Sequence, residues 1–178
     1  MSKKKPSLLS WVREYLYIPV AMLLAFIVGG VIFVFGIIPS GSMEPTYMTN
    51  SIFIGNRLAN EETLARGTPV LFHYDEKQIY IKRVIGLPGD TVSFADGHVL
   101  INGAVLDESA YLSSEVATHP AFADDIFTVP DDAYFVMGDN RVNSFDSRFW
   151  EEDGRSPFVR FDDVVGTMIA AAKLPFLS

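Results

Sequence analysis

The chain has 178 residues, 49% of them hydrophobic, with a formal net charge of −8 at pH 7 and no cysteine. This length suits one domain of moderate size with an appendage. The lack of cysteine excludes disulfides and Cys-ligated metal sites. From residue 39 onward, ten Lys and Arg stand against 21 Asp and Glu. Nucleic acid is therefore not an expected partner, because its phosphates need a basic surface.

The N-terminal part divides into a basic tail and an apolar run. Residues 1–17 carry four basic side chains and one acid, whereas residues 18–38 carry no charge. As a helix, the run would span roughly 31 Å, about the thickness of a bilayer's hydrocarbon core. A buried core helix and a cleaved signal peptide are the alternatives, but the run is too long for either and no small-x-small cleavage site follows. We therefore expect a cytoplasmic tail at 1–17 and a single transmembrane anchor at 18–38, with the remaining chain on the outer face.

Residues 39–178 are expected to form a β-rich domain. Short alternating apolar runs recur with Gly and Pro between them, which is typical of antiparallel strands. The Asp96-Gly97 pair between two such runs predicts a hairpin. Residues 111–125 lack this alternation and are expected to form a loop with at most one short helical turn. The strand candidates are residues 51–55, 69–74, 78–85, 91–94, 98–101, 132–138 and 164–171.

The three histidines offer little chemistry. His73, His98 and His119 show no metal-ligand spacing, so we expect no metal. Composition leaves a histidine-based serine triad open, although none of the three stands in an obvious catalytic loop.

A stiff, hydroxyl-bearing turn follows the apolar run, at residues 39–46 (PSGSMEPT). Pro39 and Pro45 restrict the backbone, and Gly41 permits close approach. Ser42 could then be an exposed nucleophile if a base lies near it. The other interpretation is a plain linker turn after a membrane helix, since linkers use the same residues.

Lysine is the candidate base. Lys82 interrupts an apolar run at residues 79–85, so it lies either on the exposed face of a half-buried strand or against apolar neighbours. Burial would lower the pKa of the lysine towards ~7–8, where it could take a proton from serine.

A third polar stretch, residues 138–148 (GDNRVNSFDSR), follows a core-like strand. It is dense in hydroxyls, amides and opposite charges. It could be a solvated loop with Asx-turns or a structured network beside a site.

Together, PSGSMEPT (39–46), YIKRVIGLPGD (80–90) and GDNRVNSFDSR (138–148) resemble the motifs of bacterial type I signal peptidases, in the family's order and directly after an apolar run. The resemblance implies a catalytic domain of coiled antiparallel sheets, with an accessory region at about 91–137 that is reduced here. It also implies a membrane-bound serine endopeptidase that removes signal peptides from exported preproteins, cutting after small residues at −1 and −3.

The resemblance also implies a role for each matching residue. Ser42 corresponds to the nucleophile and Lys82 to the general base. The Ser40 hydroxyl and the Ser42 backbone N–H correspond to the oxyanion hole. Ser144 corresponds to the residue that orients the lysine amine.

The charged residues of the motifs correspond to two supporting ion pairs. These are Asp139 with Arg83, and Asp146 with Arg148. No cofactor is implied. The partners implied are preprotein signal peptides, the lipid bilayer and the secretion translocon.

Two departures and two alternatives accompany the resemblance. Residues 49–54 lack the Gly-Asp that usually opens the family's strand, and Val142 stands where an acidic residue is frequent. The same chemistry could serve a paralogue that matures one dedicated secretion or conjugation substrate. A membrane-tethered domain that binds peptides without cutting them is a third hypothesis.

Overall fold

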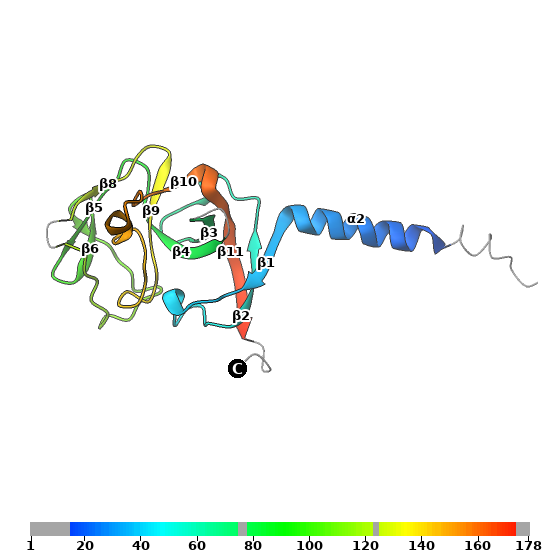
Figure 1. The fold of residues 1–178 in the computed structure, drawn as a ribbon, viewed down its shortest axis with the longest axis horizontal. Coiled ribbons are helices and arrows are strands. Elements are labelled where there is room, and N and C mark those ends of the chain that lie inside the picture. The colour runs from blue at the N-terminus through cyan, green and yellow to red at the C-terminus, as the bar shows by residue number, and fades with distance from the viewer. Residues whose placement is uncertain (1–14, 75–77, 123–124, 174–178) are drawn as a thin grey trace, which may run out of the picture.

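The computed structural model describes residues 15–74, 78–122 and 125–173, and shows a β domain with one helix projecting from it (Figure 1). The first 14 residues of the predicted tail and the last five residues of the chain lie outside the described residues.

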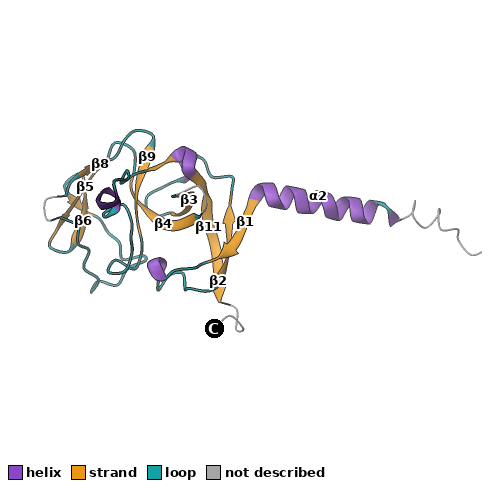
Figure 2. Ribbon diagram, viewed as in Figure 1, coloured by secondary structure: helices purple, strands orange, loops and turns teal. Residues whose placement is uncertain are grey.

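The larger sheet contains seven strands, and every pair of neighbours in it is antiparallel (Figure 2). Their register shifts at several points, between Val84 and Gly86 and twice within the C-terminal strand, and such irregularities bend a sheet. The predicted antiparallel β architecture is therefore confirmed. In spatial order the strands are β1 (Phe33–Ile37), β2 (Ser51–Asn56), β11 (Val164–Lys173), β3 (Pro69–His73), β4 (Ile79–Gly86), β9 (Ala133–Met137) and β10 (Val159–Arg160).

A second sheet has the order β7 (Ala104–Val105), β6 (His98–Ile101), β5 (Thr91–Ala95) and β8 (Phe127–Thr128). The predicted hairpin joins β5 to β6. Asp96 and Gly97 both have positive φ, 50° and 78°, as a two-residue type I′ turn requires. The expected accessory region thus supplies this sheet, and its last residues return to the larger sheet as β9.

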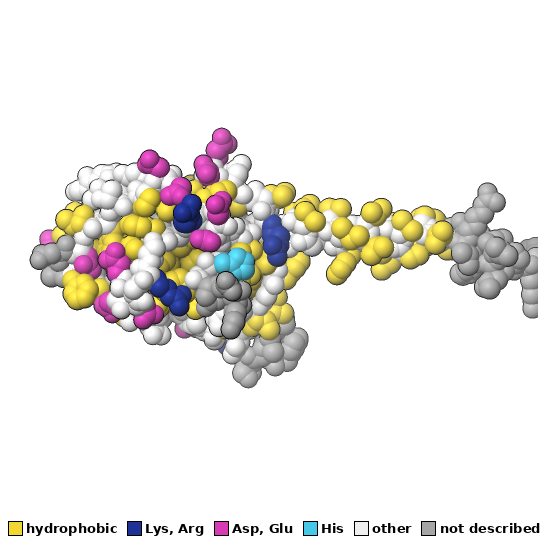
Figure 3. Space-filling model, turned by 45° about the horizontal axis from the view of Figure 1, so that its top comes forward, with side chains coloured by type: hydrophobic (Ala, Val, Ile, Leu, Met, Phe, Trp, Pro, Cys, Tyr) yellow, Lys and Arg dark blue, Asp and Glu magenta, His cyan; other side chains and the backbone are white. Residues whose placement is uncertain are grey.

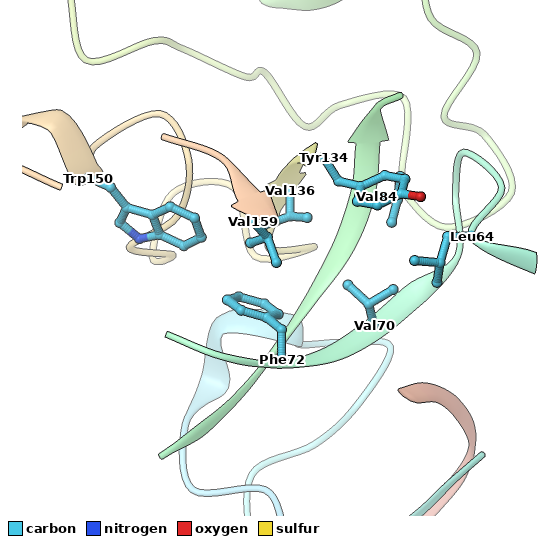
Figure 4. Close-up of a cluster of buried hydrophobic side chains, with 8 residues drawn as sticks. All are labelled: Leu64, Val70, Phe72, Val84, Tyr134, Val136, Trp150 and Val159. Carbon is cyan, nitrogen blue, oxygen red and sulfur yellow. The ribbon is translucent and has the colours of Figure 1, made fainter. Parts of the chain in front are cut away.

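Buried side chains from both faces of the central strands hold the domain together. One cluster is drawn in Figure 4, where Phe72 of β3 faces Trp150 with ring centroids 6.0 Å apart. A second cluster, including Ile85, Val92 and Phe135, joins the two sheets. All of β9 and most of β4 are buried, so polar residues on these strands are held in a rigid, dry setting. Short 3-10 helices η2 (Glu61–Thr63), η3 (Trp150–Asp153) and η4 (Phe161–Asp163) connect the strands.

The helix α2 (Tyr17–Ile32) is shorter than the predicted anchor at 18–38, and this part of the prediction is corrected. Residues 33–37 instead form β1, which pairs with β2 along its whole length. Strand is favoured because Val34 and Ile38 bury themselves against Phe53, while an uninterrupted helix would withdraw them from this cluster. Within the described residues, no helix combines the length and apolarity needed to cross a bilayer. Apolar side chains nevertheless cover the described part of α2 in the view of Figure 3.

Candidate active site

The loop that carries Ser42 is closed at its base by the first two strands. The Ile38 amide donates to Ser51 O at 2.9 Å, and the Asn50 amide donates to Ile38 O at 2.8 Å. Inside the loop, the Glu44 carboxylate accepts bonds from the Thr49 amide at 3.1 Å and the Thr49 hydroxyl at 2.8 Å. These bonds lower the pKa of Glu44, so the carboxylate stays ionised and keeps the loop closed.

Ser42 lies in the short 3-10 helix η1 (Gly41–Met43), which is clamped from outside by Asn140. The Asn140 amide N–H donates to Ser42 O at 3.0 Å, and its side-chain Nδ2 donates to Gly41 O at 3.0 Å. Two bonds from one residue, 99 positions away from Gly41, fix the backbone of the serine against the loop at 138–148. The predicted turn is thus a fixed structure rather than a plain linker.

Lys82 is almost fully buried in β4, with only 2% of its surface exposed. Of the two interpretations of its face, the structure therefore supports burial. Burial lowers the pKa of Lys82 to about 8, because the charged amine loses hydration. The charges of Asp146 and Asp139 oppose this shift, and that of Arg148 adds to it. Near neutral pH the lysine is therefore much more easily deprotonated than a solvated one.

Asp139 and Arg83, the residue after Lys82 in β4, form a buried ion pair. Arg83 Nε donates to Asp139 Oδ1 at 2.7 Å, and Nη2 donates to the other carboxylate oxygen. The remaining Arg83 nitrogen donates to Gly67 O at 2.6 Å, and Tyr111 stacks on the guanidinium at 4.0 Å. The carboxylate is thus paired with its own cation, and its charge raises the pKa of Lys82 less than burial lowers it.

Asp146 and Arg148 form the second pair brought together as predicted. Two bonds of 2.9 Å join the guanidinium to the carboxylate, and both side chains are buried. Asp146 also accepts the Gly138 amide at 3.0 Å. The pair therefore ties the end of β9 to the polar loop and leaves little net charge beside the lysine.

Ser144 is buried, and its hydroxyl has no hydrogen-bond partner among the described residues. Gly138 makes room for it: a Cβ at Gly138 would lie 2.2 Å from Ser144 Oγ and 2.4 Å from Ser42 O. A side chain at 138 would therefore displace both serines. An unpaired buried hydroxyl is costly in structural terms, so its presence here needs another reason.

Two pockets meet at the serines. The wider one, of about 570 Å³, is lined by Ser40, Ser42, Lys82 and Ser144 among others. The narrower one, of about 260 Å³, also contains Ser40 and Ser42, and its other walls are mainly apolar, including Ile38, Met43 and Ile81. All four predicted residues thus line one cavity. Neither pocket is lined by a histidine, and all three histidines are exposed.

Sequence reasoning missed two residues of this site. Asn140 clamps the serine loop as described above. Arg141 is buried, donates to Gly138 O at 3.0 Å and to Thr118 Oγ1 at 2.7 Å, and pairs with Glu108. Both stand inside the third motif, directly after Asp139, and this position was the one sequence feature that could have indicated a role in the site. Their partners are distant in sequence and no local pattern reveals them.

Comparison with known proteins assigns most of the chain to one family model. The model described as "Signal peptidase, peptidase S26" matches residues 8–172.

Named relatives agree with this match. "Signal peptidase I P" of Bacillus subtilis subsp. natto is 35% identical over 173 residues, which are 93% of this chain and 88% of the relative. "Signal peptidase I S" of Bacillus subtilis strain 168 is 37% identical, over 82% of this chain and 80% of the relative. "Probable signal peptidase I-2" of Synechocystis sp. is 42% identical over 64% of this chain, and the match spans only 53% of that protein. Among solved structures, a signal peptidase I from Enterococcus faecalis V583 is 32% identical, with a TM-score of 0.46, covering 59% of this chain and 96% of the other.

Proposed function

The chain belongs to the bacterial type I signal peptidases, serine endopeptidases of the peptidase S26 family, and we propose that it removes signal peptides from exported preproteins with a Ser42–Lys82 dyad. The observation that carries the proposal is the buried lysine. Lys82 shares a pocket with Ser42, and burial brings the pKa of Lys82 down to about 8.

The proposed reaction has two steps. Neutral Lys82 takes the proton of the Ser42 hydroxyl while Oγ bonds to the scissile carbonyl carbon. The C–N bond then breaks, and Lys82 returns the proton to the departing amine, leaving an ester on Ser42. In the second step Lys82 takes a proton from a water molecule while the water oxygen bonds to the ester carbon. The bond between that carbon and Ser42 Oγ then breaks, and Lys82 returns the proton to Oγ, which frees the carboxylic acid and restores the serine and the neutral lysine.

Ser40, Ser42 and Ser144 have supporting roles in this mechanism. The Ser40 hydroxyl and the Ser42 N–H would donate to the oxyanion, where charge develops in the transition state. The Ser144 hydroxyl, which has no partner among the described residues, would orient the Lys82 amine. The Arg83–Asp139 and Arg148–Asp146 pairs would hold the lysine's surroundings rigid without fixing its proton.

The signal peptide would bind along β4. In the described sheet, β9 pairs with β4 only from Arg83 onward, so the edge at Ile79–Ile81 has β3 as its only strand neighbour. An extended peptide could add to that edge through backbone hydrogen bonds. Its side chains would then face the narrow apolar pocket beside Ser42, of about 260 Å³, which would take the small residues at −1 and −3.

The proposal includes attachment to the outer face of the cytoplasmic membrane. Support comes from α2, whose described residues carry no charge and whose large side chains, such as Leu23 and Phe26, are exposed. The 11 residues before Ser40 are all apolar or glycine save Pro39. Such a connection would hold the serine close to the depth at which a signal peptide leaves the bilayer.

The testing experiment is cleavage of a preprotein with an Ala-x-Ala site in detergent, scanned over pH. Because Lys82 must lose its proton to act, we expect kcat/KM to rise with pH and to level off above about 8. Ser42→Ala and Lys82→Ala should each abolish cleavage and keep the fold. Activity retained by either variant would contradict the dyad.

The histidines provide the control. Replacing His73, His98 or His119 by Ala should leave turnover close to wild type, because all three are exposed and none lines a pocket with Ser42. A dead histidine variant would favour a triad. A folded wild-type protein that cuts no general preprotein, but cuts one secretion substrate, would favour the dedicated paralogue.

A further inference from the structure

We propose that the wider pocket beside Lys82 binds the first residues of the mature protein and selects apolar side chains there, through Val142 and Phe145. This inference rests on the proposed function, because it assigns the segment that leaves after the bond is cut.

The position of Lys82 indicates which pocket holds the leaving segment and which holds the signal peptide. Ser40, Ser42 and Tyr80 line both pockets, so a peptide crossing Ser42 passes from one pocket to the other. Lys82 lines the wider pocket and is not among the residues of the narrower one. The departing amine receives its proton from the general base. The leaving segment therefore lies in the wider pocket, and the signal peptide lies in the narrower one.

The rim of the wider pocket is unusually apolar for a surface facing solvent. Val142 is 87% exposed and Phe145 is 45% exposed, although both stand in a loop of otherwise polar residues. Phe149 and Tyr80 add two further aromatic walls. Among the described residues that line this pocket, Lys82 carries the one charged side chain. An apolar side chain entering it would lose water on several sides, which favours binding.

The aromatic wall is held in place before any peptide arrives. Tyr74 packs edge-on against Phe145, with ring centroids 6.4 Å apart, and against Tyr80 at 5.0 Å. The Arg155 guanidinium lies over the Tyr74 ring, 4.4 Å from its centroid. Phe145 is thus buttressed from behind while its outer face stays open. A wall that is already ordered loses little freedom on binding.

The experiment uses the full chain in detergent and two preproteins that share one signal peptide. They differ only in the first two mature residues, Leu-Leu in one and Ser-Ser in the other. We expect wild-type kcat/KM to be about tenfold higher for the Leu-Leu substrate, the scale of discrimination that an apolar pocket provides. Val142→Asp and Phe145→Ala should each bring this ratio close to one.

Matched variants test whether the location matters. Val105→Asp and Phe122→Ala change side chains that are 63% and 64% exposed but line neither pocket beside Ser42. Both should keep the wild-type ratio between the two substrates. Circular dichroism of each variant checks that the fold is retained.

The outcomes separate the inference from the function it rests on. If the wild type cuts both substrates equally well, the selectivity inference is overturned while the peptidase stands. If a folded wild type cuts neither, both fall. The last outcome concerns lipid. If Val142→Asp lowers cleavage of both substrates equally when the assay contains lipid vesicles, and has no effect in detergent, then Val142 contacts lipid and the inference is overturned.

Discussion

At the scale of single residues, burial of the Lys82 amine lowers the stability of the fold and makes the amine easier to deprotonate. Its pKa falls from 10.5 to about 8 because the amine is buried, a difference of about 3 kcal/mol between its two protonation states. Between these two pH values the unfolded chain holds the proton and the folded chain has released it. Stability therefore rises with pH across that window, and the full cost of burial is present below pH 8.

Lys82→Met removes this cost with a side chain of similar length. We expect the free energy of unfolding to rise by up to about 3 kcal/mol at pH 6, and the gain to shrink as the pH rises from about 8 to 10.5. Denaturant titrations at pH 6 and pH 10 measure both values. Lys173→Met, at an exposed position of β11, should show no such pH-dependent gain. A variant less stable than wild type at pH 6 would contradict the burial cost.

For Ser144, we expect the loss of the hydroxyl to lower activity without lowering stability. Its buried hydroxyl has no partner among the described residues, so Ser144→Ala should leave the free energy of unfolding unchanged or slightly higher. We nevertheless expect kcat to fall by at least about tenfold, because the lysine amine loses its orienting group. Kinetics and denaturation of the same preparation measure both effects.

Ser147 is the matched control three residues along the same loop. Its hydroxyl accepts the Val136 amide at 2.9 Å in the buried core. Ser147→Ala should therefore cost about 1–3 kcal/mol of stability, because that amide is left without a partner. If Ser144→Ala destabilised the fold as much as Ser147→Ala, a structural role would explain Ser144 better.

At the scale of elements, the sequence predicted what local patterns determine. The hairpin at Asp96-Gly97 follows from turn chemistry, and the strands follow from alternation. The end of the helix at Ile32 could not be predicted from the sequence, because residues 33–37 are as apolar as the helix before them. Only the pairing of β1 with β2, which is a tertiary contact, makes them a strand.

In the site, too, sequence motifs predicted some features, whereas others depend on tertiary contacts. The motif residues Ser42, Lys82 and Ser144 were predicted from resemblance, and the structure places them around one pocket. The clamp by Asn140 on Gly41 spans 99 positions, which no periodicity encodes. Burial of Lys82 also needed the fold, since alternation alone fits an exposed face equally well.

Arg141 is the element-scale link between the loop after β9 and the segment around β7. It joins Gly138 O to Glu108 and Thr118, which belong to the accessory region. Arg141→Met would leave the partly buried Glu108 carboxylate without its cation, so we expect a loss of about 3–5 kcal/mol in the free energy of unfolding. Denaturant titration measures the loss.

Arg160 is the control for this prediction. It pairs with Asp132 at 2.9 Å, but both side chains are more than half exposed. Because water screens such a pair, Arg160→Met should cost less than about 1 kcal/mol. Equal losses in the two variants would show that Arg141 acts only as a surface ion pair.

At the scale of the whole molecule, an acidic β domain is joined to an apolar helix that projects from it. Every residue of α2 is at least partly exposed, and Phe26, at 80%, is the extreme. Sixteen residues extend about 24 Å, which is shorter than the roughly 30 Å of a bilayer's hydrocarbon core. The proposed membrane attachment would therefore rest on the apolar surface of this helix, since the domain's net negative charge is repelled by anionic lipid.

Lysines in the middle of α2 test this attachment in the full chain. We expect Leu23→Lys combined with Ile27→Lys to reduce sedimentation with phospholipid vesicles strongly, because each charge costs about 2.5–3.5 kcal/mol at the centre of a membrane helix. Ile169→Lys places one such charge on an exposed apolar position of β11 and should leave sedimentation unchanged. Cleavage of a preprotein in detergent should persist in all three proteins, since Ser42 and Lys82 are untouched. Vesicle binding by the double variant that equals wild type would show that another surface holds the protein to the membrane.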